Sequence, residues 1–316
     1  MSKLISLIIP AYNEAEVIEL FYLETIKVID SFIDNDYRFE FIFINDGSID
    51  ETLKIVKKLQ AKDSRICYVD LSRNFGKEIA LTAGLDNVND QVSAVIIIDA
   101  DLQHPPKLIP KMLESWEKGN QDVYAKRKDR NDESYVKRLF SKFYYFILKK
   151  LSEDEVQTNI GDFRLLDRKV LDAFLEIRET QRYNKGLFTW VGFRKAYIEY
   201  DIEQRRAGTT KWSFSNLLNL AVEGITSSSI RPLRLASFTG IIVSVIAFIW
   251  LIKVLIKTLL FNESVQGYPS LIITVLFLGG IQLLSLGLIG EYLGRVFKET
   301  KNRPLYFINE KKINEK

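Results

Sequence analysis

The sequence contains one cysteine, Cys67, and one histidine, His104, among its 316 residues. A single cysteine excludes an intramolecular disulfide, and a single histidine leaves too few ligands for a zinc site built on histidines. We expect Cys67 to be a core residue. His104 precedes two prolines, and we expect it to be a turn residue rather than a catalytic base.

The chain also lacks a strong net charge, since 44 Lys and Arg residues stand against 41 Asp and Glu, which gives +3. A large basic surface for nucleic acid is therefore not indicated. The charges are unevenly distributed: residues 230–316 carry 11 basic and 5 acidic side chains, which leaves 33 and 36 for the part before them. The N-terminus has no signal-peptide layout, so we expect the slightly acidic first part to stay in the cytoplasm.

Charged residues are missing from two apolar stretches near the C-terminus, residues 235–252 and 271–289. As helices they would be about 27 and 28 Å long, close to the hydrocarbon core of a bilayer, about 30 Å. Helices buried in a soluble core are the alternative, but both stretches are apolar all round rather than on one face. Lys and Arg residues before the first stretch and after the second predict that both ends lie in the cytoplasm.

Short apolar runs alternate with helical patterns through the first 100 residues. The runs suited to buried strands are 4–9, 39–45, 66–71 and 94–99, and the helical patterns cover about 15–32, 51–61 and 77–87. This alternation is typical of βαβ units and predicts an α/β domain with a mostly parallel sheet. No Gly-x-Gly-x-x-Gly or P-loop pattern is present, so neither a dinucleotide oxidoreductase nor a P-loop NTPase is favoured.

Polar residues follow each of the four predicted strands, where ligands of parallel sheets bind. Asp99 and Asp101 are two apart on an extended segment, so both carboxylates can face one hard cation such as Mg²⁺ or Mn²⁺. Capping or loop solvation is the alternative, but the position after a buried strand, with Gln103 following, favours a cation that bridges a diphosphate. Asp46 can hydrogen-bond a base or a ribose, or it can cap the helix that follows.

Taken together, these motifs resemble those of family 2 glycosyltransferases with the GT-A (Rossmann-like) fold. The nucleotide-sugar motifs are Pro-Ala-Tyr-Asn-Glu at 10–14, Asn-Asp-Gly-Ser at 45–48 and Asp-Ala-Asp at 99–101. Ser-Arg-Asn-Phe-Gly-Lys-Glu at 72–78 and Gly-Asp-Phe-Arg-Leu at 161–165 narrow the resemblance to the polyprenyl-phosphate branch. The whole chain is similar to bacterial bactoprenol (undecaprenyl-phosphate) glucosyltransferases and, more distantly, to dolichyl-phosphate mannose synthases.

The resemblance implies an inverting membrane enzyme that moves a hexose from a UDP-sugar to undecaprenyl phosphate, with Mg²⁺ or Mn²⁺ as cofactor. Glucose is the expected sugar; UDP-N-acetylglucosamine, UDP-galactose and GDP-mannose are alternative donors. The residues implied in donor binding are Pro10, Tyr12, Glu14, Asp46, Lys77 and Asp99. The cation would be bound by Asp101 and Gln103, and the catalytic residues would be Asp162 and Asp101. The basic residues implied in contacts with donor or acceptor phosphate are Arg127, Arg164, Arg205, Arg206 and Lys211.

The role of Asp162 follows from the chemistry of the acceptor. A phosphate monoester has its second pKa near 6, so it is already largely a dianion at neutral pH and hardly needs a base. We therefore expect Asp162 to orient the acceptor or to stabilise positive charge at the anomeric carbon, as carboxylates do in glycoside chemistry.

The expected organisation has three parts in the bacterial cytoplasmic membrane. A cytoplasmic GT-A catalytic domain covers 1–230, a transmembrane hairpin covers 231–298 with spans of about 235–257 and 270–292, and a basic cytoplasmic tail covers 299–316. Helices near 135–151 and 213–229 carry apolar stripes suited to a membrane interface, although packing against the sheet is the alternative. The basic segment at 205–211 suits an anion-binding loop or a solvated turn. A Gly-x-x-x-Gly pair at 290–294 suggests a homo-oligomer.

Two other function classes fit parts of the sequence. A processive polysaccharide synthase shares the early motifs, but no Gln-x-x-Arg-Trp follows the Gly-Asp-Phe-Arg segment and two spans are few for a polymer channel. A membrane-bound nucleotide-sugar sensor or a flippase component is the non-enzymatic alternative. The presence together of Asp99, Asp101, Gln103 and Asp162 argues against a degenerate site.

Overall fold

The computed structural model describes residues 2–32, 36–127, 160–180, 182–200, 231–261 and 267–314. Within these residues the chain forms two compact units. One unit contains a β-sheet with its covering helices and includes the C-terminal residues. The other contains the two long helices that precede those residues.

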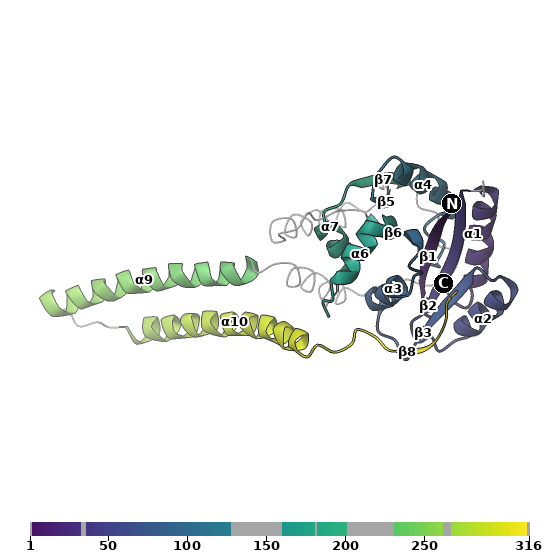
Figure 1. Cartoon of the computed structure of the whole chain (residues 1–316). Helices are drawn as coiled ribbons and strands as arrows, with labels where there is room; N and C mark the ends of the chain where they lie inside the picture. The colour runs from purple at the N-terminus through teal and green to yellow at the C-terminus, as the bar shows by residue number, and fades with distance from the viewer. Residues whose placement is uncertain are drawn as a thin grey trace. The chain divides into compact units, whose positions relative to one another are not determined.

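The described part of the first unit is built on an eight-stranded sheet with the strand order β7-β5-β6-β4-β1-β2-β3-β8 (Figure 1). The strands are β1 Lys3–Ala11, β2 Tyr37–Asn45, β3 Ile66–Leu71, β4 Val92–Ile97, β5 Asp122–Arg127, β6 Ile160–Asp167, β7 Lys195–Tyr200 and β8 Ile308–Lys312. Strands β4, β1, β2 and β3 are parallel to one another, β6 is antiparallel to its neighbours β4 and β5, and β7 is parallel to β5. The predicted α/β class with a mostly parallel sheet is confirmed.

Helices cover both faces of this sheet (Figure 1). One face is covered by α1 Ile18–Phe32, α2 Thr52–Lys62, α4 Ile109–Glu117 and a short 3₁₀ helix, Pro106–Leu108. The other face is covered by α3 Lys77–Asp86, α6 Arg168–Glu176 and α7 Asn184–Trp190. The four strands and three helices expected from the first 100 residues are all present, with shifts of a few residues at their ends.

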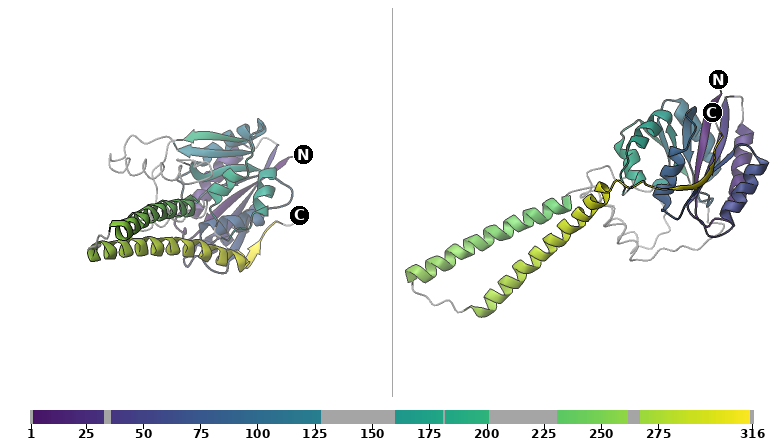
Figure 2. Two further views of the ribbon diagram at one scale, coloured as in Figure 1. Left: turned by 90° about the vertical axis from the view of Figure 1, so that its left-hand side faces the viewer. Right: turned by 60° about the horizontal axis from the view of Figure 1, so that its bottom comes forward.

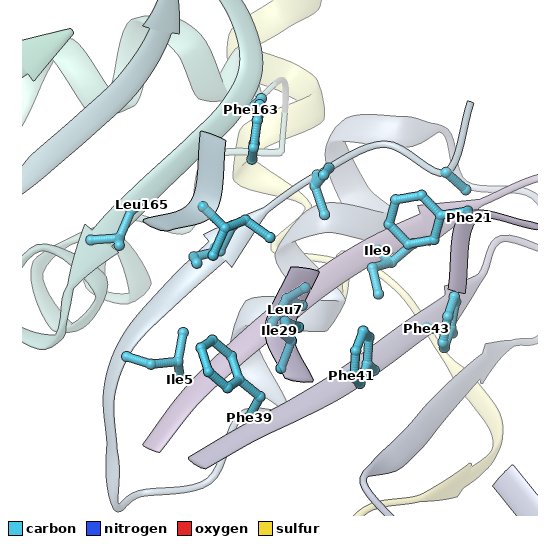
Figure 3. Packing of buried hydrophobic residues seen from close by; sticks show 14 of the residues in the cluster. Ile5, Leu7, Ile9, Phe21, Ile29, Phe39, Phe41, Phe43, Phe163 and Leu165 are labelled. Carbon is cyan, nitrogen blue, oxygen red and sulfur yellow. The ribbon is translucent and has the colours of Figure 1, made fainter. Parts of the chain in front are cut away.

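The two layers have separate cores because strand side chains alternate between the faces of the sheet. Figure 3 shows the larger core, in which Ile5, Leu7 and Ile9 of β1 pack with Phe39, Phe41 and Phe43 of β2 and with Phe21 of α1. The smaller core contains Ile8, Ile42 and Ile44 from the same two strands. Cys67 is buried in this second core, as predicted. Because side chains on both faces of the central strands are buried, the pairing register of these strands is fixed. Their carboxyl ends therefore lie at defined positions.

The C-terminal residues include a strand of the sheet. The sequence predicts a basic cytoplasmic tail over 299–316, and within this segment β8 pairs antiparallel with β3 and is the edge strand of the sheet (Figure 1). The side chain of Asn309 donates a hydrogen bond to Asp70 of β3 at 2.8 Å. The sequence of β8, Ile-Asn-Glu-Lys-Lys, looks like a solvated tail because edge strands carry charged side chains that discourage further pairing.

The second unit consists, in its described part, of α9 Arg231–Phe261 and α10 Tyr268–Thr300, which lie beside each other in both views of Figure 2. Their 31 and 33 residues correspond to about 46 and 50 Å of helix. Phe277–Thr300 of α10 is long and apolar enough to cross a membrane, and none of it is buried. The apolar stretch described in α9, Gly240–Trp250, is shorter.

Several predicted features lie outside the described residues. They are the helices near 135–151 and 213–229 and the basic residues Arg205, Arg206 and Lys211.

Candidate active site

A cavity of about 320 Å³ lies at the carboxyl ends of β1, β2 and β4 and at the start of α3. Its lining contains seven of the residues predicted to bind the donor or the cation: Pro10, Tyr12, Glu14, Asp46, Lys77, Asp99 and Asp101. These residues come from loops that follow different strands. They meet because parallel strands end at the same edge of a sheet.

Hydrogen bonds between neighbouring loops fix the walls of this cavity. The amide of Asn13 donates to the hydroxyl of Ser48 at 3.0 Å, and the amide of Glu14 donates to the hydroxyl of Thr52 at 2.9 Å. Gly47 has a positive φ of 64°, and a Cβ at this position would lie 2.4 Å from backbone atoms of Arg73 and Asn74. Only glycine therefore permits the close approach of the loops after β2 and β3.

Asp46 connects these same two loops. One carboxylate oxygen accepts a hydrogen bond from the amide of Phe75 at 2.7 Å, and the other accepts from the amide of Gly76 at 3.0 Å. Burial raises the pKa of Asp46, although these two amides oppose the shift. Asp46 therefore supports the turn into α3 and does not cap the helix after its own strand. The N-cap position of α2 is Glu51, and Asp50 before it accepts a hydrogen bond from the amide of Thr52, the first residue of α2, at 3.0 Å.

Lys77 lies between two of the predicted site carboxylates. Its ammonium nitrogen is 2.7 Å from an oxygen of Asp99 and 2.6 Å from an oxygen of Asp162. The side chains of Asp99 and Asp162 are 19% and 13% exposed, whereas that of Lys77 is 44% exposed and can turn toward a ligand. Burial opposes the charge on Lys77, but the two carboxylates outweigh it and raise the pKa of Lys77 above its usual value.

The same ion pairs determine the charge of Asp162. Burial favours its neutral form, but the ammonium groups of Lys77 and Lys185 outweigh burial and lower the pKa of Asp162 to about 2. Lys185 Nζ is 3.5 Å from Asp162. Asp162 is therefore a carboxylate at all physiological pH values and a weak base.

Lys185 was not predicted as a site residue. The preceding residue, Asn184, is tied to Glu78 of α3: its amide donates to the Glu78 carboxylate and its side chain donates to the Glu78 carbonyl, both at 2.9 Å. These two bonds fix the start of α7 against α3 and bring Lys185 to Asp162. In the sequence, the one indication of this contact is Glu78, which directly follows Lys77.

Asp101 and Gln103 lie in the turn after β4, where the amide of Gln103 donates to Asp101 Oδ1 at 3.0 Å. Asp101 lines the cavity and Gln103 is half-buried beside it. A carboxylate and an amide oxygen are suitable ligands for Mg²⁺ or Mn²⁺. Among the described residues, no group of three or more His, Cys, Asp or Glu side chains is arranged to hold a metal. Asp101 and Gln103 offer two oxygen ligands, and a cation bound at this turn would need further ligands from water or from a bound ligand.

His104 is buried next to Asp99, which lines the cavity, and 3% of its surface is exposed. Its Nδ1 is 2.8 Å from the hydroxyl of Tyr200, and its Nε2 is 3.8 Å from Asp99. Burial lowers the pKa of His104. The predicted phosphate ligand Arg127 donates through Nε to the same Tyr200 hydroxyl at 3.4 Å. His104 does lie in a turn, as expected, but its contacts with Tyr200 and Asp99 were not predicted.

Arg164 does not lie in the cavity. It is 1% exposed, pairs with Asp122 at 3.3 Å and has its guanidinium 4.3 Å from the ring centre of Phe188. We predicted a phosphate contact for Arg164, and this buried position does not support it. Strand β6 is antiparallel to β4, with Arg164 opposite Ile97, so Asp162 reaches the level of Asp99 while Arg164 lies two residues deeper in the core.

Two family models match the chain. The model of glycosyl transferase family 2 matches residues 6–175, which contain most of β1, the strands β2 to β6 and the cavity. A second family model, described as the GtrB C-terminal hairpin, matches residues 231–296, which contain α9 and most of α10.

Curated relatives align with nearly the whole chain. A putative glycosyltransferase of Bacillus subtilis, CsbB, is 45% identical over 99% of this chain and 93% of its own length. A prophage bactoprenol glucosyl transferase homolog of Escherichia coli is 42% identical over 98% of this chain and 99% of its own length. The bactoprenol glucosyl transferase of Shigella phage SfX is 41% identical, with the same coverage.

Proposed function

The chain belongs to glycosyl transferase family 2, and on that premise we propose that it transfers glucose from UDP-glucose to undecaprenyl phosphate. The observation that carries the proposal is the cavity at the strand ends, which collects the predicted donor residues around the Lys77–Asp99–Asp162 ion pairs. The names of the relatives from Escherichia coli and phage SfX support glucose as the sugar and bactoprenol as the lipid.

The donor would occupy the cavity with its nucleotide near Pro10, Tyr12 and Asp46 and its sugar near Asp99. Tyr12 is 44% exposed, so its ring is available to a base. Asp46 keeps unused lone pairs after accepting from Phe75 and Gly76, and these can accept from uridine. The ammonium of Lys77 can leave the two carboxylates and bind the diphosphate.

The reaction is a single displacement at the anomeric carbon. An oxygen of the lipid phosphate forms a bond to this carbon, the bond from the carbon to the UDP oxygen breaks, and its electron pair leaves with UDP. The products are lipid-phosphate-linked glucose, with inverted configuration, and UDP. No proton has to be removed from the acceptor, because a phosphate monoester is largely a dianion at neutral pH.

Asp162 suits electrostatic stabilisation better than base catalysis. A carboxylate with a pKa of about 2 has little affinity for a proton, but it keeps its negative charge, which the proposed role requires beside the reacting carbon. Oxocarbenium-like charge develops at that carbon when the bond to UDP breaks, and fixed opposite charge stabilises it. Lys185, 3.5 Å from Asp162, would hold this carboxylate in place after Lys77 has turned to the diphosphate.

A divalent cation would be held by Asp101 and Gln103, with the diphosphate of the donor completing its ligands. It would neutralise the charge that the departing UDP acquires. The oxygen ligands fit Mg²⁺ and Mn²⁺ equally well, so the proposal covers both.

The membrane hairpin is part of the same proposal. Exposed apolar side chains along α9 and α10 suit lipid, and both helices are long enough to cross a bilayer. In sequence, the helix pair lies between β7 and β8, which are strands of one sheet. A segment that begins and ends at the same domain must cross the membrane an even number of times. Two spans with the sheet on the cytoplasmic side satisfy this condition and the distribution of Lys and Arg.

The choice of sugar can be tested with membranes that contain the chain. These membranes are incubated with undecaprenyl phosphate and with one of several labelled donors. We expect UDP-glucose to label the lipid fraction, with UDP-galactose, UDP-N-acetylglucosamine and GDP-mannose labelling it weakly. Preferred labelling from another UDP-sugar would change the sugar and keep the reaction. An absence of product from every UDP-sugar would contradict the proposal.

The homo-oligomer suggested by the Gly-x-x-x-Gly pair at 290–294 stays a prediction from sequence.

A further inference from the structure

The only histidine of the chain lies beneath the candidate active site, and the proposed reaction assigns it no role. His104 follows the turn that holds Asp101 and Gln103, and 3% of its surface is exposed. Its ring packs against Phe163, the residue after Asp162, with 5.6 Å between ring centres. It also contacts Tyr200 of β7, which is 96 residues away in sequence.

Space for the imidazole ring depends on a glycine. A Cβ on Gly161 would lie 2.6 Å from Cε1 of His104, which is closer than real Cβ atoms approach a neighbour. The glycine of the Gly-Asp-Phe-Arg segment therefore makes room for the histidine of the Asp-Leu-Gln-His segment. The turn after β4, which carries His104, and the start of β6, which carries Gly161, therefore pack closely against each other.

The hydrogen bonds around His104 have a direction. Arg127 can only donate, so its Nε donates to the Tyr200 oxygen at 3.4 Å. The Tyr200 oxygen lies 2.8 Å from Nδ1 of His104, so the hydroxyl can donate to Nδ1 if the ring hydrogen is on Nε2, or accept from Nδ1–H in the other tautomer. The bond that the Tyr200 oxygen already accepts from Arg127 favours the first arrangement. Nε2 faces Asp99 at 3.8 Å, slightly too far for a hydrogen bond while Asp99 is held by Lys77.

One end of this chain of contacts is Asp99, and the other is Arg127, which the sequence predicts to contact donor or acceptor phosphate. Asp99 lines the donor cavity. Arg127 and Tyr200 are paired residues at the ends of β5 and β7, and the segments predicted to meet the acceptor follow them in sequence. Tyr200 is five residues before Arg205.

We propose that Arg127, Tyr200 and His104 form a hydrogen-bond relay to Asp99, in which His104 is a positioning residue held as the Nε2–H tautomer. When Lys77 turns to the diphosphate of a bound donor, Asp99 closes on Nε2–H, and the relay holds Asp99 against the sugar. An acceptor phosphate that binds Arg127 strengthens the hydrogen bonds at the Arg127 end of the relay. This inference rests on the proposed function for its kinetic consequences, but the tautomer itself is independent of it.

The tautomer can be read directly because the chain has one histidine. The full chain, purified in detergent with a histidine-free tag and labelled with ¹⁵N-histidine, gives a single imidazole in NMR spectra. We expect a protonated Nε2 and a hydrogen-bond-accepting Nδ1, and we expect Tyr200→Phe to move the Nδ1 resonance. Tyr68→Phe is the matched control, since it removes a hydroxyl from another buried tyrosine outside the relay. A protonated Nδ1 in the neutral ring, or an Nδ1 resonance unchanged by Tyr200→Phe, would overturn the relay.

The kinetic test uses UDP-glucose and undecaprenyl phosphate with the same protein. His104→Phe keeps an aromatic ring in the site but cannot donate to Asp99, so we expect kcat to fall roughly tenfold. His104→Gln restores an N–H near the position of Nε2 and should recover most of that loss. Tyr200→Phe should lower kcat less, and combining it with His104→Phe should add nothing.

Thermal unfolding and UDP binding identify variants that have lost the fold. If His104→Phe does not fold, Tyr200→Phe and its effect on Nδ1 carry the test. A folded His104→Phe with unchanged kcat, or a folded His104→Gln as slow as His104→Phe, would contradict the relay. If the wild-type chain transfers no sugar from any UDP donor, the proposed function fails, while the NMR result still decides the tautomer.

Discussion

The ammonium nitrogen of Lys77 lies 2.6 Å from a carboxylate oxygen of Asp162, a residue 85 positions later in the sequence. This ion pair joins the start of α3, where Lys77 lines the cavity, to β6. With Lys185 it keeps Asp162 ionised, and this charge is what the proposed transfer requires at the anomeric carbon.

Asp162→Asn removes this charge and keeps the shape of the side chain. We expect kcat to fall by about 10²–10³-fold, the loss typical of removing one preorganised electrostatic group. The dissociation constant of UDP, measured by calorimetry, should change little because Asp162 does not line the cavity. Asp172→Asn on α6, which removes an exposed carboxylate, is the control and should behave as wild type. Undiminished turnover of Asp162→Asn would remove its catalytic role.

The rate of transfer as a function of pH should follow the ionisation of the acceptor phosphate and not that of Asp162. With a pKa of about 2, Asp162 stays ionised from pH 4 to pH 8. The rate should therefore fall below about pH 6, where the lipid phosphate takes up its second proton. Lys185→Gln should leave the midpoint of this acid limb in place. A midpoint that moves with Lys185→Gln would identify Asp162 as the titrating base.

The same pKa predicts how acid affects stability. Asp162 has a lower pKa in the folded chain than its value of about 3.9 in the unfolded chain. Its ion pairs therefore stabilise the fold fully above about pH 4 and lose this contribution as the pH falls toward about 2. Between pH 6 and pH 3 the thermal unfolding midpoint should fall less in Asp162→Asn than in the wild-type chain. An equal fall in both would contradict the lowered pKa.

Removal of the divalent cation should weaken UDP binding and abolish transfer. The proposed ligands are Asp101 and Gln103, so Asp101→Asn and Gln103→Ala should shift the Mn²⁺ titration of UDP binding to higher concentration by roughly 10–100-fold. Gln91→Ala is the control, because Gln91 is an exposed glutamine in the loop before β4. UDP binding that is tight in EDTA and unaffected by Asp101→Asn would contradict a cation at this turn.

The C-terminal strand should support the donor site from a distance. Asn309 of β8 donates to Asp70 of β3, and Asn45, the residue before Asp46, donates to the other oxygen of Asp70 at 2.7 Å. Asn309→Ala should lower the free energy of unfolding by about 1.5–3 kcal/mol, the range for a hydrogen bond to a charged group. Lys312→Ala removes an exposed side chain from the same strand and is the control. Deletion of 304–316 without loss of stability would contradict the role of β8.

The two-span topology can be checked by cysteine labelling in intact cells. Cys67 is buried and burial raises its pKa to about 11, so it should contribute little background. A membrane-impermeant maleimide should label Ser264→Cys, between the spans, from outside the cytoplasmic membrane. It should label Lys301→Cys, after α10, only in permeabilised cells. Labelling of both positions from the same side would exclude a transmembrane hairpin.

The parts of the fold that sequence predicted are those with a local pattern. Strands β1 to β4 are continuous apolar runs because both of their faces are buried, and their polar ends mark the cavity. Strand β8 was missed because an edge strand carries Lys and Glu and has no apolar alternation. The short strand β5, with charged residues at both ends, was missed for a similar reason.

The parts of the site that sequence did not predict depend on distant contacts. Lys185 reaches Asp162 only because Asn184 is tied to Glu78, and no spacing pattern encodes that contact. His104 looked like a turn residue because its partner Tyr200 belongs to a strand 96 residues later. Arg164 was expected at the phosphate because it follows Asp162 by two residues. The antiparallel direction of β6 carries it away from the cavity and into the core.

The most direct test of the account is a product measurement with the purified full chain, UDP-glucose, Mn²⁺ and undecaprenyl phosphate in detergent. The account predicts that UDP and lipid-phosphate-linked glucose form in equal amounts and that both require the lipid phosphate. UDP release that is independent of the lipid, or no release from any UDP-sugar, would contradict it.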